Sequence, residues 1–462
     1  MESRQSSQSA SVPDEPPRGT SVRGAAGTAD ITPDRPVRLA GMARRRVLSV
    51  RASEKLSANA MLFEDSRGRL QGILSLDLLF AGPDLTDRLR DFAGKELNIA
   101  KGDLLIAASH THSAPPVDRR KPALGPVDDD YLEWVTQRCC ELLRSLAAQR
   151  REPLCFRGGI VEWHGAVYRR RYWPVPHLTR EGPSLRGIVL APDRDRSISR
   201  DVRLLEVTDD AGRTVAVIWS AACHPTGWPS QHGQSPDYIG IVRDRLAAMP
   251  GGPGPVPVLF LQGFAGDLRP DVPDGRSWIR RAGRAVLFGP NFNTFDAATW
   301  SAWSEELAST LAAALAAFRR QTATPLVGRL AGAVVELPLA DVLDGPNKSG
   351  RVVEFQRLHL GTMCDILAVS AEPSSMLLPL LDDPDIWPTG YSGDVFGYWP
   401  TDLQRQEGGY EGKGWIAHFS LRGSLRPERD RLFRKTLSAL SECLKRDLQD
   451  ISDVPVSPRA RA

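Results

Sequence analysis

The sequence predicts an α/β protein in which mixed β-sheets are flanked by helices. Three observations predict this class: apolar runs of strand length, segments with helical spacing of apolar residues, and the alternation of the two along the chain. The 462 residues are 41% hydrophobic and 25% charged, a globular composition that can bury one large core or two ordinary ones. Periodicity alone does not distinguish one layered α/β architecture from another.

The first predicted elements alternate between strand and helix. Apolar runs at 69–80 and 103–108 predict strands, and 84–97, which lies between them, has helical spacing. A second helix is predicted at 130–149, because its apolar side chains form one stripe along a helix. This stripe consists of Leu132, Val135, Cys139, Leu142, Leu143 and Leu146.

The later elements follow the same pattern. Strands are predicted at 202–208, 214–222 and 256–262, and the last of these follows a turn rich in Gly and Pro. A long helix of Ala and Leu covers about 302–319. The remaining predicted elements are strands at 326–338, 352–360 and 364–370 and an amphipathic helix at 429–449.

One domain is predicted over residues 29–450, with disordered tails at 1–28 and 451–462. The first tail is rich in Ser, Pro, Gly and Arg, and it has too few large apolar residues to offset the entropy of ordering. Two long connections, 270–297 and 382–415, contain several aromatic residues. We predict that they are functional or mobile loops.

Charge and cysteine content limit which partners and which cellular compartment are expected. The 59 basic and 56 acidic side chains give a formal charge of +3, so a nucleic-acid partner is not expected. The run Arg44–Arg46 is interpreted as a solvated face. We find no secretory signal, no apolar run of membrane-spanning length and no disulfide framework among the six cysteines. These features predict a cytoplasmic, reduced protein, and they leave open its oligomeric state and transient contact with a membrane surface.

The most informative motif is SHTHSAP at 109–115, at the end of an apolar run. On extended backbone, the imidazoles of His110 and His112 would point to the same face of a sheet. Histidine is also the commonest metal ligand and an acid or base that works near neutral pH. Alone the motif is weak evidence, because two surface or hydrogen-bonded histidines would explain it equally well.

Three further segments supply partners for these histidines. His224 lies in ACHPT and Glu372 in AEPSSM, each directly after a predicted strand, and Tyr398 precedes Tyr410 by twelve residues. Each has an ordinary alternative. The histidine could cap a strand end, the carboxylate could belong to a plain loop, and the tyrosines could be packing aromatics.

Taken in order, these motifs resemble the catalytic domain of the neutral/alkaline (non-lysosomal) ceramidase family over about residues 29–412. The segment QGFAGD at 262–267 extends the resemblance. It implies one zinc ion per chain, bound by His110, His224, Glu372 and Tyr398. The residues that it implies for holding and activating the scissile amide are His112, Arg169 and Tyr410. The register near Arg169 is loose, so Arg170 is an alternative, and His232 and Asp237 are candidates for supporting the site.

The implied chemistry is coherent. Zinc accepts nitrogen and oxygen ligands and lowers the pKa of a bound water to near 7. A phenol and a guanidinium could stabilise the oxyanion, and His112 could carry the proton to the leaving nitrogen. The predicted function is therefore zinc-dependent cleavage of a linear amide C–N bond, by zinc-activated water, in a ceramide-like or other lipidic amide.

Two other functions remain open: hydrolysis of a small polar or anionic amide or ester in specialised metabolism, and zinc binding without catalysis. The presence of His112 and Tyr410 beside all four implied ligands argues against the second.

The chain also departs from the resembling family. Arg269 stands where ceramidases carry a serine, so a serine nucleophile at that position is excluded. About fifty residues follow the paired tyrosines, too few for the family's C-terminal immunoglobulin-like domain, which is therefore not expected. The loop at 270–297 holds aromatics suited to an acyl chain and four arginines suited to an anionic group, namely Arg276, Arg280, Arg281 and Arg284.

Overall fold

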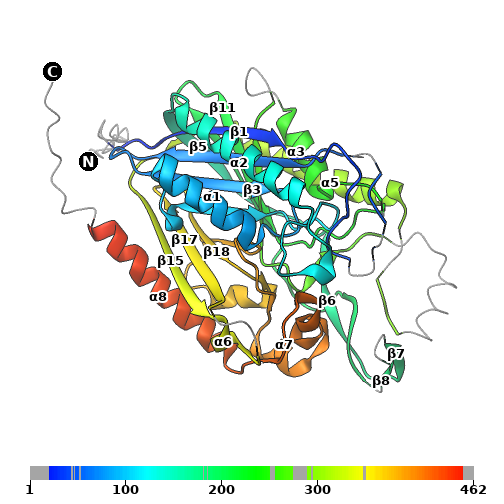
Figure 1. The fold of residues 1–462 in the computed structure, drawn as a ribbon. Coiled ribbons are helices and arrows are strands. Elements are labelled where there is room, and N and C mark those ends of the chain that lie inside the picture. Colours follow the sequence, from blue (N-terminus) through cyan, green and yellow to red (C-terminus); the bar gives the residue numbers. More distant parts are fainter. Residues whose placement is uncertain are drawn as a thin grey trace, which may run out of the picture.

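A nine-stranded mixed sheet forms the centre of the computed structural model (Figure 1). The structure describes residues 20–42, 45, 47–50, 54–179, 182–184, 186–230, 232–249, 255–273, 289–292, 295–346 and 350–450. Along the sheet the strands are β12 (Val258–Gln262), β11 (Thr214–Ala221), β10 (Asp201–Asp209), β5 (Glu152–Glu162), β1 (Arg23–Asp30), β2 (Ser57–Glu64), β3 (Leu70–Leu76) and β4 (Leu104–Ala108), and β14 (Thr324–Pro325) pairs with β5.

Helices cover the outer face of this sheet. Helices α1 (Gly82–Leu97) and α2 (Asp129–Ala148) share a core with β1 to β4, whereas α3 (Tyr238–Ala247) and α5 (Ala297–Phe318) share another with β10 to β12. The inner face follows the period of two that a strand imposes. In β2, for example, Leu62 packs beneath the helices while Met61 and Phe63 point to the inner core.

The two edges of the large sheet meet, which positions the site described below. Ser75 of β3 donates its hydroxyl to the carbonyl of Phe260 in β12 at 2.6 Å, although these strands lie near opposite ends of the strand order. The backbone N–H of Phe260 in turn donates to the Ser75 hydroxyl at 3.3 Å. Side chains from both halves of the sheet join one inner core.

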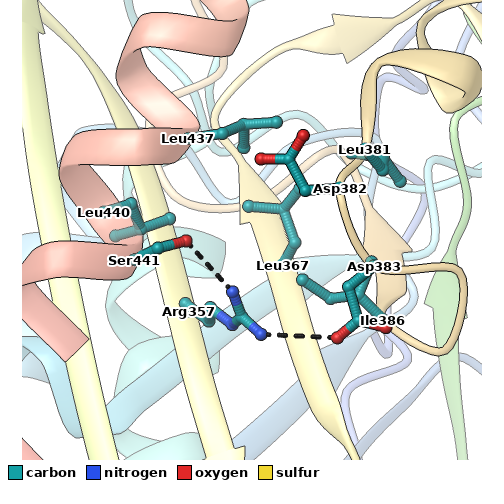
Figure 2. Close-up of a pocket in the computed structure, with 9 residues that line it drawn as sticks. All are labelled: Arg357, Leu367, Leu381, Asp382, Asp383, Ile386, Leu437, Leu440 and Ser441. Atoms are coloured by element: carbon teal, nitrogen blue, oxygen red, sulfur yellow. Dashed lines mark hydrogen bonds and ion pairs between the residues drawn. The ribbon is translucent and has the colours of Figure 1, made fainter. Parts of the chain in front are cut away.

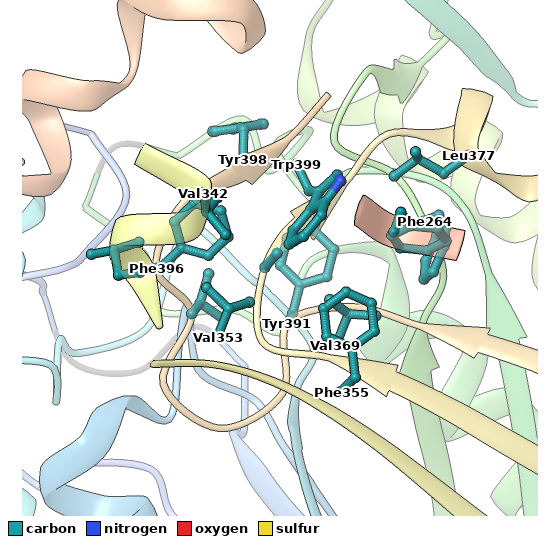
Figure 3. Packing of buried hydrophobic residues seen from close by; sticks show 14 of the residues in the cluster. Phe264, Val342, Val353, Phe355, Val369, Leu377, Tyr391, Phe396, Tyr398 and Trp399 are labelled. Atoms are coloured by element: carbon teal, nitrogen blue, oxygen red, sulfur yellow. The ribbon is translucent and has the colours of Figure 1, made fainter. Parts of the chain in front are cut away.

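A second sheet closes the inner core. It contains β15 (Leu330–Pro338), β17 (Val352–Leu360), β18 (Asp365–Val369) and β20 (Trp387–Thr389). Helix α8 (Arg429–Asp450) runs along β15 and β17 (Figure 1). Residues of these strands and of α8 share one buried cluster with the aromatic residues Phe355, Tyr391, Tyr398 and Trp399 (Figure 3). Two residues of this cluster, Tyr391 and Tyr398, therefore reach the candidate site from a rigid support.

Short elements complete the fold. The three-stranded sheet contains β13 (Leu268–Pro270), β6 (Ala166–Trp173) and β9 (Gly187–Asp193). Two-stranded pairs join β19 (Glu372–Pro373) to β21 (Tyr398–Trp399), β16 (Leu343–Asp344) to β22 (Ser424–Leu425), and β7 (His177–Thr179) to β8 (Gly182–Ser184). The remaining short helices are α6 (Leu339–Val342), α7 (Asp402–Glu407), a π-helical turn (Tyr410–Gly414) and 3₁₀ turns at Lys101–Asp103, Pro122–Leu124, Ser375–Leu380 and Ile416–Phe419.

The predicted α/β class is confirmed, and the predicted strands and helices are present with shifts at their ends. The predicted N-terminal tail is wrong in part, because β1 begins at Arg23 and pairs with β2 along its whole length. The predicted loop at 382–415 contains β20, β21 and α7 and is not irregular throughout. The second tail at 451–462, and Arg276, Arg280, Arg281 and Arg284, lie outside the described residues.

A buried carboxylate links the sheet to its helical layer. Glu206 in β10 is fully buried and accepts hydrogen bonds from Arg157 Nε at 2.7 Å, Thr214 Oγ1 at 2.7 Å and Arg319 Nε at 2.8 Å. Burial alone would raise the pKa of Glu206, but these three hydrogen bonds and the charge of Arg319 outweigh it and lower that pKa. The ionised carboxylate of Glu206 and its three donors therefore stabilise the fold.

We predict that Glu206→Gln lowers the free energy of unfolding by about 3 kcal/mol at neutral pH, because two arginines lose their buried counter-ion. The wild-type advantage is complete above the ordinary pKa of 4.5 and disappears as the pH falls through the lower folded pKa. Urea unfolding of both proteins from neutral to acidic pH checks this. A stability difference that stayed constant across that range would contradict it.

Candidate metal centre

The site forms at the ends of two strands that lie at or next to opposite edges of the large sheet. His110 follows the end of β4 by two residues and His224 follows the end of β11 by three, and both strands belong to parallel pairs. Glu372 begins β19, which pairs in parallel with β21, so that Glu372 lies opposite Tyr398. Because the sheet edges meet, residues more than a hundred positions apart converge at one point.

Three imidazoles are held by the same kind of contact. Nδ1 of His110 lies 2.9 Å from the carbonyl oxygen of Leu79, Nδ1 of His112 lies 3.0 Å from that of Gly41, and Nδ1 of His224 lies 3.3 Å from that of Ala265. A carbonyl oxygen can only accept, so Nδ1 carries the proton in each ring. Each Nε2 therefore presents a lone pair.

These lone pairs point at one another. The Nε2 atoms of His110 and His224 are 3.0 Å apart, and those of His112 and His110 are 3.3 Å apart. Burial lowers the pKa of all three rings, that of His112 to about 3. The rings are therefore neutral, and no proton lies between their Nε2 atoms. Ligand atoms at 2.0–2.1 Å from a tetrahedral zinc ion lie about 3.3 Å apart. The donor set therefore fits a divalent cation, and the three rings form a group that could hold one.

A carboxylate and a phenol face the same cluster. Glu372 Oε2 lies 3.5 Å from His110 Nε2 and 3.9 Å from His224 Nε2, and among the described residues it has no hydrogen-bond partner. Burial raises the pKa of Glu372 to about 8, and a hydrogen bond with Tyr398 opposes that rise. An unpartnered buried carboxylate oxygen is costly without a cation beside it.

Two adjacent arginines have different surroundings. Arg169 donates from Nε to Glu411 at 2.6 Å and from Nη2 to the Tyr398 hydroxyl at 3.2 Å. Arg170 donates to Glu411 at 2.8 Å and to the carbonyls of Gln404 and Gly408. Of the two registers that the sequence allows, the structure places Arg169 beside Tyr398 and Arg170 beneath α7.

Tyr410 is half-buried at the start of the π-helical turn. Its ring centroid lies 5.5 Å from that of Tyr398 in an edge-to-face arrangement. Of the two candidate supporting residues, Asp237 accepts backbone hydrogen bonds from Gly227 and Trp228, in the loop after His224, at 2.9 and 2.8 Å. His232 is exposed.

The backbone reason for the convergence of His110 and His112 differs from the prediction. Strand β4 ends at Ala108, and His110 has a left-handed φ of 66°. The two rings therefore meet through a turn and not through the alternation of an extended strand. Tyr391 packs on the His110 ring with centroids 4.3 Å apart, and Phe80 does so at 4.9 Å. These aromatic contacts help to hold the unusual turn.

Sequence reasoning missed the residues that support His112. Gly41 has φ of 90°, and a Cβ there would lie 2.5 Å from His112 Nδ1. Arg45 is half-buried and donates to the His112 carbonyl at 2.9 Å, so its interpretation as part of a solvated face was wrong. Neither residue has a recognisable motif, although a run of three arginines beside Gly41 could have prompted a search.

Asp267 belongs to the QGFAGD segment, and the structure gives it a structural role. Its buried carboxylate accepts from Ser374 Oγ at 2.5 Å and Gln404 Nε2 at 2.8 Å, and its backbone carbonyl accepts from Arg169 N at 2.9 Å. Asp267 therefore connects the segment after Glu372, helix α7 and the strand that carries Arg169.

A cavity away from the three histidines has no comparable group of metal-binding side chains among the residues that line it. Arg357, Ile386, Leu440 and their neighbours line a space of about 30 Å³ beneath α8, in which Arg357 donates to Ser441 (Figure 2). That volume suits an ordered water and not a substrate. In the part of the chain that the structure describes, no helix is long and apolar enough to cross a membrane.

Two solved structures are similar to this chain over almost its whole length. The neutral ceramidase from Pseudomonas aeruginosa matches with a TM-score of 0.68 at 15% sequence identity, over 96% of this chain and 76% of that one. A ceramidase complexed with C2 matches with a TM-score of 0.67 at 15% identity, over 96% and 77%. Neither a protein-family model nor a curated protein matches. The predicted resemblance to neutral ceramidase is therefore confirmed at the level of the fold.

We predict that Gly41→Ala lowers affinity for zinc by about 10-fold, the lower end of the effect of disturbing a group around a metal ligand, because His112 Nε2 lies 3.3 Å from Nε2 of the implied ligand His110. The added methyl group would push the His112 ring from its place. Gly68→Ala is the matched control, because Gly68 has a similar φ of 83° with nothing within 4 Å. Competition with a chromophoric chelator measures both affinities. Equal affinities in the two variants would contradict the role given to Gly41.

Proposed function

We propose that this chain is a zinc-dependent amidohydrolase that cleaves the N-acyl amide bond of a ceramide-like or other lipidic amide. One observation carries the proposal: three imidazole Nε2 atoms and an unpartnered carboxylate oxygen converge in a buried site. The similarity of the fold to neutral ceramidase supports the amide as the bond that is cleaved. The catalytic unit is the predicted 29–450 domain, extended at its start to include β1.

We assign one ion per chain to the ligands His110, His224, Glu372 and Tyr398. Two neutral imidazoles, a carboxylate and a phenol supply the nitrogen and oxygen donors that zinc accepts. Cationic charge beside Glu372 would favour its ionised form and reverse the effect of burial on its pKa. Zinc bound there would polarise the substrate carbonyl and lower the pKa of water.

His112 is assigned as the group that moves the proton. It is the only one of the three clustered histidines that is partly exposed, so substrate and water can reach it. Its Nδ1 is occupied by the Gly41 carbonyl, which leaves Nε2 to accept a proton from the attacking water. Burial and the charge of Arg45 keep the ring neutral at the start. Negative charge developing beside it raises its pKa, and Nε2 then returns the proton to the leaving nitrogen.

Arg169 and Tyr410 are assigned to the developing oxyanion. Glu411 and Tyr398 orient the Arg169 guanidinium, so its remaining N–H groups need no reorganisation as charge develops. Tyr410 lies beside Tyr398 and is more exposed, as a group that meets the substrate must be. Both are donors that fit an oxygen carrying negative charge.

We predict that zinc-loaded protein releases fatty acid from a short-chain ceramide, and that His110→Ala reduces the rate by about 100-fold or more, because disturbing a residue behind a ligand already costs 10- to 100-fold. His164→Ala is the control, since that side chain is 71% exposed and pairs with Glu162. Mass spectrometry of the released acid measures the rate. No release from folded, zinc-containing protein, or equal release from His110→Ala, would refute the assignment.

A further inference from the structure

We propose that Arg269 binds an anionic group, a carboxylate or a phosphate, on the substrate whose amide is cleaved at the metal centre. The inference rests on the proposed function, and it narrows the substrate to amides that carry negative charge close to the scissile bond. It starts from a cation that the fold places beside the site and that has no counter-ion among the described residues.

Arg269 lies in β13, opposite Val167 of β6 and two residues along from Arg169 on the neighbouring strand. Its guanidinium packs on the ring of Phe292, with Cζ 4.6 Å from the ring centroid. The side chain is only partly exposed, so a ligand can reach it while much of it is shielded from water. A guanidinium held on an aromatic face presents its N–H groups in one plane, which suits the two oxygens of a carboxylate or phosphate.

The carboxylates near Arg269 that the structure describes all have other partners. Asp237 accepts three backbone N–H groups, Asp267 accepts from Ser374 and Gln404, and Asp271 pairs with Arg194. Among the described residues, none forms an ion pair with Arg269. Its neighbours Arg169 and Arg170, in contrast, share the carboxylate of Glu411.

The uncompensated charge is close to the reacting groups. Burial, and then the charge of Arg169, lowers the pKa of Arg269 to about 10, so the side chain is still cationic at neutral pH. Arg269 lies opposite Val167, two residues along β6 from Arg169, whose guanidinium donates to the Tyr398 hydroxyl. A shielded cation without a partner is unfavourable. An anionic substrate would supply the missing partner next to the scissile amide.

The test uses three N-acyl amides that share one acyl chain and differ beyond the nitrogen: an N-acylglycine, an N-acylethanolamine and its O-phosphate. A charge-assisted hydrogen bond contributes about 1.5–3 kcal/mol, which corresponds to roughly 10- to 150-fold. We expect zinc-loaded wild-type protein to prefer one or both anionic substrates over the neutral one in kcat/KM by that factor. The two anionic arms distinguish carboxylate from phosphate recognition.

Arg269→Gln should remove this preference, so that kcat/KM for the anionic substrates falls to about that of the neutral amide in the same variant. Arg194→Gln is the control, because it removes a cation from the exposed Asp271 pair nearby. Arg269→Gln should also be at least as stable as wild type, because it removes an uncompensated charge. Equal kcat/KM for all three substrates in wild type, or a preference that survives in Arg269→Gln, would overturn the inference while the proposed hydrolase function stood.

If none of the amides is cleaved, the proposed function fails and binding decides the inference. Calorimetry would then compare the N-acylglycine and the O-phosphate with the N-acylethanolamine on zinc-loaded wild type and Arg269→Gln. Tighter binding of an anionic compound that is lost in Arg269→Gln would support an anion site at Arg269. Binding that does not depend on Arg269 would overturn it.

Discussion

The orientation of three histidines by backbone carbonyls is the constraint on which the candidate site depends. Each Nδ1–H is used by a carbonyl oxygen, so each Nε2 carries a lone pair, and the Nε2 atoms of His112 and His224 both lie against that of His110. That arrangement exists only because the edges of the large sheet meet, which brings the ends of β4 and β11 together. The capacity of these residues to hold a metal ion is therefore a consequence of how the sheet closes as well as of which residues are present.

Near the histidines, the two arginines of β6 share a carboxylate, whereas Arg269 of β13 has no ion-pair partner among the residues that the structure describes. Glu411 neutralises Arg169 and Arg170, and Asp267 is saturated by hydrogen bonds, so these groups contribute rigidity. Arg269 is shielded and has no ion-pair partner among the described residues. Stability alone would favour a neutral side chain there. We therefore propose that a ligand explains this cation beside the proposed catalytic centre, which the described residues leave without an ion pair.

The sequence predicted the parts of the fold that have a strong apolar period, including α1, α2, α8 and the strands at the site. It missed β1, because RGAAGTAD consists mostly of small residues. At Gly27 a Cβ would lie 3.1 Å from Leu142 and 3.2 Å from Leu146 of α2. Close packing against this helix, and not hydrophobicity, therefore explains the composition of β1. Motif order identified the residues that converge at the site. It could not give the left-handed turn at His110 or the contact of Arg45 with His112, because both depend on tertiary structure.

The central claim is that one divalent ion binds at the Nε2 atoms of this cluster. Diffraction from zinc-loaded crystals, measured on both sides of the zinc absorption edge, tests it most directly. The account predicts one strong anomalous peak at ligand distance from the Nε2 atoms of His110 and His224 and from the carboxylate of Glu372. A peak elsewhere, or none at saturating zinc, would contradict it.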